Sequence, residues 1–227
     1  MTNAVIVSTA RTPLAKSWKG AFNMTYGPTL GGHAVQHAVA RAGIDPAEVE
    51  DVIMGGTFGE GTTGGNVARQ IALRGGCPVT TAGMTINRFC SSGLQTIATA
   101  AQRIIAGEGD IYAAGGVESM SRWPMGSDGG AWVMDPRVNS ALSFVPQGVS
   151  ADLIATLEGF SRADLDAFAA VSHRRAAAAQ AAGHFNRSIV PVTDLKAHIP
   201  RMEGFHRRYM ASNKILRLWT RMARKLD

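Results

Sequence analysis

Residues 86–95, with the sequence INRFCSSGLQ, join a predicted strand to a predicted helix. The apolar run at residues 79–87 is a strand candidate, and residues 91–105 carry apolar side chains at helical spacing. Further strands are expected at residues 4–8, 51–57 and 110–114, and helices at residues 30–42, 66–73, 150–156 and 161–183. Strands that alternate with helices over the first 120 residues predict a layered α/β domain built from βαβ units.

Cys90 lies where the predicted strand meets the predicted helix. The unpaired N–H groups and the dipole at a helix N-terminus favour an anion, so a thiolate would be stabilised there. The small residues at 91–93 leave room for a bulky acyl partner. Placement alone leaves two interpretations open, a reactive nucleophile or a buried structural cysteine. The second cysteine, Cys77, is expected to be a small core residue.

The composition of the 227 residues is that of a globular protein, with 45% hydrophobic and 18% charged residues. Two cysteines are too few for a disulfide framework or a structural zinc site. No apolar run approaches the roughly 18 residues that a membrane span needs. The first residues also lack the basic start of a signal peptide. We therefore expect a cytoplasmic protein without a membrane span.

The net charge of +6 is concentrated at one end of the chain. Residues 1–195 carry 14 basic and 15 acidic side chains, whereas residues 196–227 carry 9 basic and 2 acidic ones. The nearly neutral main part gives no reason to expect a nucleic-acid partner. Taken alone, the basic end could be an amphipathic helix that binds a membrane surface or nucleic acid. We favour a shifted reading frame, because out-of-frame translation of GC-rich DNA is often rich in arginine; sequencing of the coding DNA tests this hypothesis.

Two other features suggest chemistry only weakly. His33 and His37 have the i, i+4 spacing of a metal pair, but no third ligand is evident, so no metal is expected. The glycine-rich run at residues 59–65 lacks the Gly-Lys-Ser/Thr of a phosphate-binding loop. Neither feature changes the prediction centred on Cys90.

Residues 86–104 resemble the active-site signature of the thiolase family. Four further stretches resemble thiolase segments in the same order: residues 7–13 (VSTARTP), 66–70 (NVARQ), 114–121 (AGGVESMS) and 168–188. The resemblance covers residues 4–194, and several motifs in one order are more specific than any one alone.

The resemblance implies a thiolase-like layered fold, αβαβα in the full family. It also implies that Cys90 carries an acyl group as a thioester, between a 3-oxoacyl-CoA and coenzyme A or in the reverse condensation. Coenzyme A thioesters would be the substrates, with no separate cofactor, and the chain would form a homodimer or homotetramer. A ketoacyl synthase-like condensing enzyme shares the architecture and stays an alternative.

The resemblance extends only to the N-terminal half of a thiolase and most of its loop domain. Three motifs of the family's second half do not occur: Gly-His-Pro, Asn-Glu-Ala-Phe and Cys-x-Gly-Gly. We divide the chain into an N-terminal domain with the nucleophile (1–121), a loop-domain region with the following helix (122–194) and a basic non-family tail (195–227). No coenzyme A contact is assigned to a residue. The interpretation is a truncated thiolase with little activity alone; the alternative is a catalytically dead relic or interaction protein.

Overall fold

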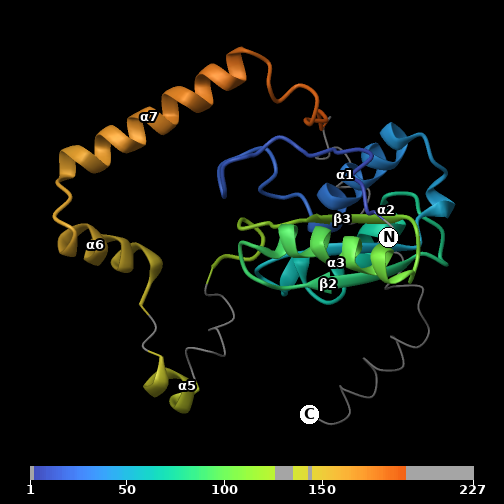
Figure 1. The fold of residues 1–227 in the computed structure, drawn as a ribbon, viewed down its shortest axis with the longest axis horizontal. Helices are drawn as coiled ribbons and strands as arrows, with labels where there is room; N and C mark the ends of the chain where they lie inside the picture. Colours follow the sequence, from blue (N-terminus) through green and yellow to red (C-terminus); the bar gives the residue numbers. More distant parts are fainter. Residues whose placement is uncertain (1–2, 126–134, 143–144, 193–227) are drawn as a thin grey trace, which may run out of the picture. The chain divides into compact units, whose positions relative to one another are not determined.

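The centre of the fold is a parallel sheet. The computed structural model describes residues 3–125, 135–142 and 145–192. Within them, β1 (Asp51–Gly55), β2 (Ala82–Ile86) and β3 (Tyr112–Gly116) form a sheet in the order β2-β1-β3 (Figure 1). Gly55 is in register with Ile86 on one side and Gly116 on the other, so the three carboxyl ends meet at one edge. The predicted α/β class with a parallel sheet is confirmed.

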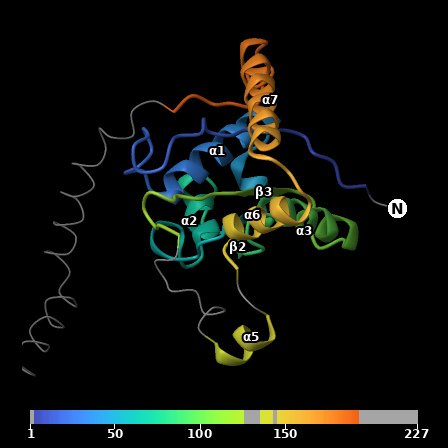
Figure 2. The same ribbon diagram turned by 90° about the vertical axis from the view of Figure 1, so that its left-hand side faces the viewer.

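Helices cover both faces of the sheet. α1 (Gly27–Ala42) and α2 (Val67–Arg74) share a hydrophobic core with Val52 and Met54 of β1. α3 (Ser92–Ala106) lies on the other face (Figure 2). On that face, a Cβ added to Gly55 of β1 would contact Ser92. The crossovers through α2 and α3 run in opposite directions across the sheet, so right-handed connections place these helices on opposite faces.

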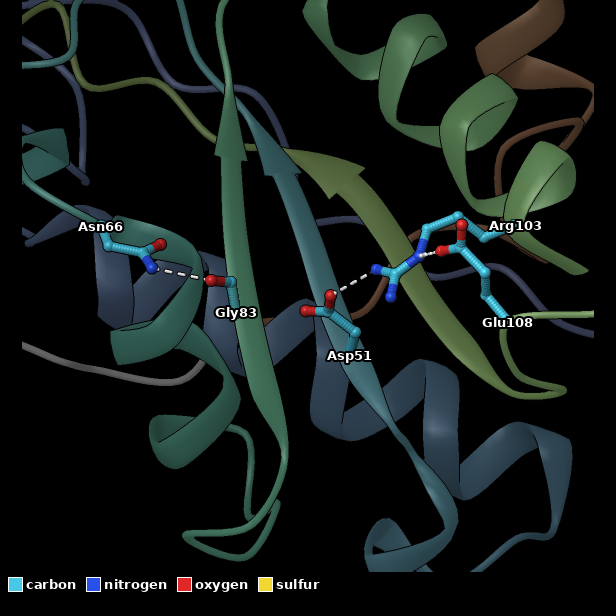
Figure 3. A network of polar contacts seen from close by, with 5 residues as sticks. All are labelled: Asp51, Asn66, Gly83, Arg103 and Glu108. Atoms are coloured by element: carbon cyan, nitrogen blue, oxygen red, sulfur yellow. Dashed lines mark hydrogen bonds and ion pairs between the residues drawn. The ribbon is translucent and has the colours of Figure 1, made fainter. Parts of the chain in front are cut away.

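Polar contacts tie the helices to the strands. Asn66 caps α2 by accepting from the N–H of Arg69, and its amide donates to the carbonyl of Gly83 in β2 at 2.7 Å. On the other face, Arg103 of α3 donates to the carboxylates of Asp51 at 2.7 Å and Glu108 at 2.8 Å (Figure 3). Its guanidinium also lies over the Tyr112 ring, 5.0 Å from the centroid. These contacts fix the N-terminus of α2 to β2 and the C-terminal turn of α3 to β1.

The predicted strand at residues 4–8 is wrong. These residues form no strand, and the side chains of Val5, Ile6 and Val7 are exposed. Both edges of β1 are occupied by β2 and β3, and residues 4–10 line an apolar cavity beside β3 without pairing with it. Among the described residues, β3 therefore has one edge without a partner strand.

Most other predicted elements are confirmed with shifted ends. The strand expected at 79–87 is shortened to Ala82–Ile86, and the helix expected at 91–105 is α3, Ser92–Ala106. Later in the chain lie α5 (Pro136–Ala141), α6 (Gln147–Leu157) and α7 (Arg162–Ala181). Two short 3-10 helices, Pro46–Glu48 and Gly61–Thr63, flank β1.

α7 lies in the predicted loop-domain region, and its N-terminus carries a capping box. Ser161 Oγ accepts from the N–H of Asp164, and the Asp164 carboxylate accepts from the N–H of Ser161.

Within the described ranges, every helix is too short or too polar to cross a bilayer. Residues 126–134 of the loop-domain region and the predicted tail at 195–227 lie outside the described residues.

Candidate active site

Cys90 lies on a tight turn between β2 and α3, and its side chain is exposed. The N–H groups of Ser91 and Ser92 donate to the carbonyls of Arg88 and Phe89 at 3.1 and 3.0 Å. Phe89 has a φ of 48°, in the left-handed region that non-glycine residues rarely adopt. The exposed position excludes the buried structural cysteine, while the role of Cys90 as nucleophile stays a prediction.

The buried side chain of Ser92 stabilises this turn. Its side chain is buried at the start of α3, and its Oγ accepts from the N–H of Arg88 at 2.9 Å while donating to the carbonyl of Phe89 at 2.5 Å. One hydroxyl thus closes the turn from both sides. Outside the turn, the Arg88 guanidinium donates to Gln95 Oε1 at 2.6 Å, which links the turn to the first turns of α3.

Asn87 connects the turn to the loop that follows β1. Its amide nitrogen donates to the carbonyl of Thr57 at 2.8 Å, and its Oδ1 accepts from the N–H of Phe89 at 2.9 Å. The side chain is exposed. Asn87 therefore spans two neighbouring strand ends with one amide group.

Glu118, which follows β3, forms hydrogen bonds with the same loop after β1. It lies two residues after β3, and its Oε2 accepts from the N–H groups of Thr57 and Phe58 at 2.7 and 3.2 Å. Its other oxygen accepts from Thr63 Oγ1 at 3.4 Å. The loops after β1, β2 and β3 are therefore joined at the carboxyl edge of the sheet, the edge at which open parallel sheets bind ligands.

The surroundings of Cys90 suit an anionic nucleophile. Ser91 is the N-cap of α3, and no side chain caps the helix start. Cys90 is the residue before this N-cap, and the positive end of a helix dipole favours a negatively charged group near it. An exposed thiolate at such a position can attack an electrophilic carbon and carry the group as a thioester.

The other residues considered from the sequence do not join this site. Cys77 is buried, and burial raises the pKa of its thiol, so it is the core residue that was expected. The His33 and His37 rings lie edge to face with centroids 4.5 Å apart. In the part of the chain that the structure describes, no three potential ligands gather into a metal site.

Sequence reasoning did not assign roles to Asn87, Ser92 or Glu118. Asn87 is the last residue of the predicted strand at 79–87, whereas Ser92 and Glu118 follow the ends of predicted strands by a few residues. This placement is the signal that could have found them. Because the carboxyl ends of parallel strands meet at one edge, polar residues just beyond them are candidates for one site.

Comparisons with known proteins identify the family of the chain. The family model "Thiolase, N-terminal domain" matches residues 4–201. A second model, "ODP family beta lactamase", matches only residues 176–227. The 3-ketoacyl-CoA thiolase of Bacillus subtilis is 42% identical over 198 residues, which cover 85% of this chain and 49% of the relative.

Two other relatives match this chain with similar sequence identity. The acetyl-CoA acetyltransferase of Cupriavidus necator is 39% identical over 216 residues, covering 90% of this chain and 53% of the relative. A protein of Arabidopsis thaliana named 3-ketoacyl-CoA thiolase 2, peroxisomal, is 38% identical over 194 residues, covering 84% of this chain and 41% of the relative. The chain spans about half the length of the curated relatives it matches. Since the family model matches most of the 227 residues, the chain belongs to the thiolase family through its N-terminal domain.

Proposed function

We propose that Cys90 is the acyl-carrying nucleophile of an acyl-CoA thiolase. The observation that carries the proposal is the exposed thiol at the uncapped N-terminus of α3, on a turn fastened by Ser92 and Asn87. A thioester formed with Cys90 has an energy close to that of the coenzyme A thioester it replaces, so the transfer is reversible.

In the proposed reaction, the Cys90 thiolate attacks the keto carbon of a 3-oxoacyl-CoA. The bond between C2 and C3 breaks, its electron pair leaves on C2, and protonation of C2 releases acetyl-CoA. The acyl group stays on Sγ. The thiolate of a second coenzyme A then attacks that thioester, which restores the Cys90 thiolate and releases the shortened acyl-CoA. The reverse sequence condenses two coenzyme A thioesters.

The substrate class is supported by the names of the relatives, which are 3-ketoacyl-CoA thiolases and an acetyl-CoA acetyltransferase. We propose coenzyme A thioesters as the substrates of this chain, and we also propose a homo-oligomeric state and a cytoplasmic location, which the names of these relatives do not address. A ketoacyl synthase-like activity has no observation in its favour beyond the shared nucleophile type.

The 227 residues alone are expected to turn over slowly. The thiolase motifs that contribute a catalytic His, an oxyanion-hole Asn and a second Cys do not occur in them. Without a base and oxyanion donors, a positioned nucleophile loses several orders of magnitude in rate. A first half-reaction, acylation of Cys90, is a less demanding measure of the proposed chemistry than turnover.

Incubation with acetoacetyl-CoA, followed by mass spectrometry of the digested protein, tests the proposal. We expect one acetyl group on the Cys90 peptide, none in Cys90→Ser, and unchanged labelling of Cys90 in Cys77→Ser. Folding of each variant is checked by circular dichroism. Absence of acetylation in folded wild-type protein would refute the proposal and favour the non-catalytic relic.

A further inference from the structure

We propose that Glu118 is a positioning residue for Cys90 and acts through Thr57 and Asn87. The inference rests on the proposed function only in that Cys90 is the group whose position matters. Glu118 follows β3, Thr57 follows β1 and Asn87 follows β2, so the three residues connect all three strand ends. In the part of the chain that the structure describes, the Glu118 carboxylate accepts hydrogen bonds from the loop after β1, and we infer that its effect on the Cys90 turn passes through that loop.

The first link is the carboxylate of Glu118 on the β1 loop. One oxygen accepts from two successive N–H groups, those of Thr57 and Phe58, at 2.7 and 3.2 Å. Hydrogen bonds to an ionised acceptor are roughly twice as strong as neutral ones. The Phe58 N–H and the Thr57 carbonyl belong to the same planar peptide group, so the carboxylate holds the direction of that carbonyl through its contact with the Phe58 N–H.

The second link is the Asn87 amide. Its nitrogen donates to that carbonyl at 2.8 Å, and its oxygen accepts from the N–H of Phe89 at 2.9 Å. An exposed amide group holds one orientation only while both partners stay in place. A displaced Thr57 carbonyl would let the Asn87 side chain rotate and release the N–H of Phe89.

The third link is the backbone of Phe89 itself. Its left-handed φ of 48° costs about 1–2 kcal/mol for a residue with a Cβ. Such a conformation persists only where surrounding contacts hold it. Ser92 supplies contacts from α3, and the chain of hydrogen bonds from Glu118 through Thr57 and Asn87 (the relay) supplies a further contact. Cys90 is the next residue, and a shift of about 1 Å in a reacting group can lower a rate about 100-fold.

Hydrogen–deuterium exchange measures the relay without relying on acyl transfer. Glu118→Ala is compared with Glu60→Ala, which removes an exposed carboxylate from the same loop region and breaks no side-chain contact described above. We expect Glu118→Ala to speed exchange of the amides at residues 88–92 about tenfold relative to Glu60→Ala. Glu118→Gln retains an oxygen acceptor and is expected to stay within about twofold of wild type.

Variants at Asn87 separate the two ends of the relay. Asn87→Asp keeps the acceptor for the N–H of Phe89 but loses the donor to Thr57. If the link to Thr57 matters, Asn87→Asp speeds exchange at residues 88–92 as much as Asn87→Ala does. In an Asn87→Ala background, Glu118→Ala is expected to add no further increase there. The exposed Asn87 side chain makes both variants usable even if Glu118→Ala fails to fold.

The relay is overturned if Glu118→Ala speeds exchange only at residues 57–63, if Asn87→Asp behaves as wild type, or if the effect of Glu118→Ala persists without Asn87. Acetylation of Cys90 by acetoacetyl-CoA gives a second measurement, expected to be about tenfold slower in Glu118→Ala than in Glu60→Ala. If wild-type protein is not acetylated, the proposed function fails while the exchange measurements still decide the relay.

Discussion

Replacing Arg103 by methionine is expected to destabilise the fold far more than the same change at an exposed arginine. Arg103 lies on α3 and neutralises Asp51, whose side chain is 8% exposed, through a 2.7 Å contact. The other carboxylate oxygen of Asp51 has no hydrogen-bond partner among the described residues. Methionine fills similar volume without the charge, so the carboxylate of Asp51 would remain buried and unpaired.

The magnitude follows from the contacts that Arg103 makes. Loss of a hydrogen bond to a buried charged group costs about 1.5–3 kcal/mol. The exposed pair with Glu108 and the contact with the Tyr112 ring add about 0.5 kcal/mol each. Since Arg103 is itself 29% exposed, water will solvate part of the stranded charge. We expect a total loss of about 2–3 kcal/mol in the free energy of unfolding.

Urea unfolding followed by circular dichroism measures this loss, with Arg162→Met as the matched control. Arg162 pairs with Asp166 on α7, but both side chains are more than half exposed, so the control should lose about 0.5 kcal/mol or less. Adding Asp51→Asn to Arg103→Met should restore part of the stability, because it removes the stranded charge. Equal midpoints for Arg103→Met and Arg162→Met would refute the reasoning.

Two further predictions concern the core and a close approach of strand and helix. Burial raises the pKa of the Cys77 thiol, so its neutral form stabilises the fold below the ordinary thiol pKa, and that contribution is lost as pH rises through the raised value. Urea midpoints should therefore fall between about pH 7.5 and about pH 10 more steeply in wild type than in Cys77→Ala, and equal slopes would contradict this. A Cβ on Gly55 would lie 2.6 Å from the Cβ of Ser92, so Gly55→Ala should cost about 1–3 kcal/mol. Gly59→Ala, where the Cβ meets no atom within 4 Å, is the control for the same measurement.

The sequence was sufficient to predict the elements whose patterns are local. The apolar spacing of residues 91–105 marked α3, and Ser161 with Asp164 marked the start of α7. Strand formation at residues 4–8 could not be decided in this way. A β-branched run fits a sheet, but whether it pairs depends on contacts outside the run: residues 4–10 line the same cavity as β3 and yet do not pair with its free edge.

The candidate active site was predictable only in part, because some of its contacts join residues far apart in the sequence. Cys90 stood out because its surroundings are its own neighbours in sequence. Glu118 contacts residues 60 and 61 positions earlier, and Asn87 contacts one 30 positions earlier. No local pattern predicts such pairs; they exist because the parallel sheet brings three strand ends to one edge.

Among the described residues, β3 has one edge without a partner strand, and this edge has a consequence for how the chain behaves at high concentration. In natural sheets, lysine, proline or a β-bulge on such an edge prevents a strand of another chain from pairing with the free N–H and C=O groups. Tyr112–Gly116 (YAAGG) contains neither a charged residue nor proline. Apart from Tyr112, its residues are alanine and glycine, whose side chains would obstruct an incoming strand little. Crowded expression would therefore favour edge-to-edge pairing between copies, and aggregation should begin at this strand before the hydrophobic core opens.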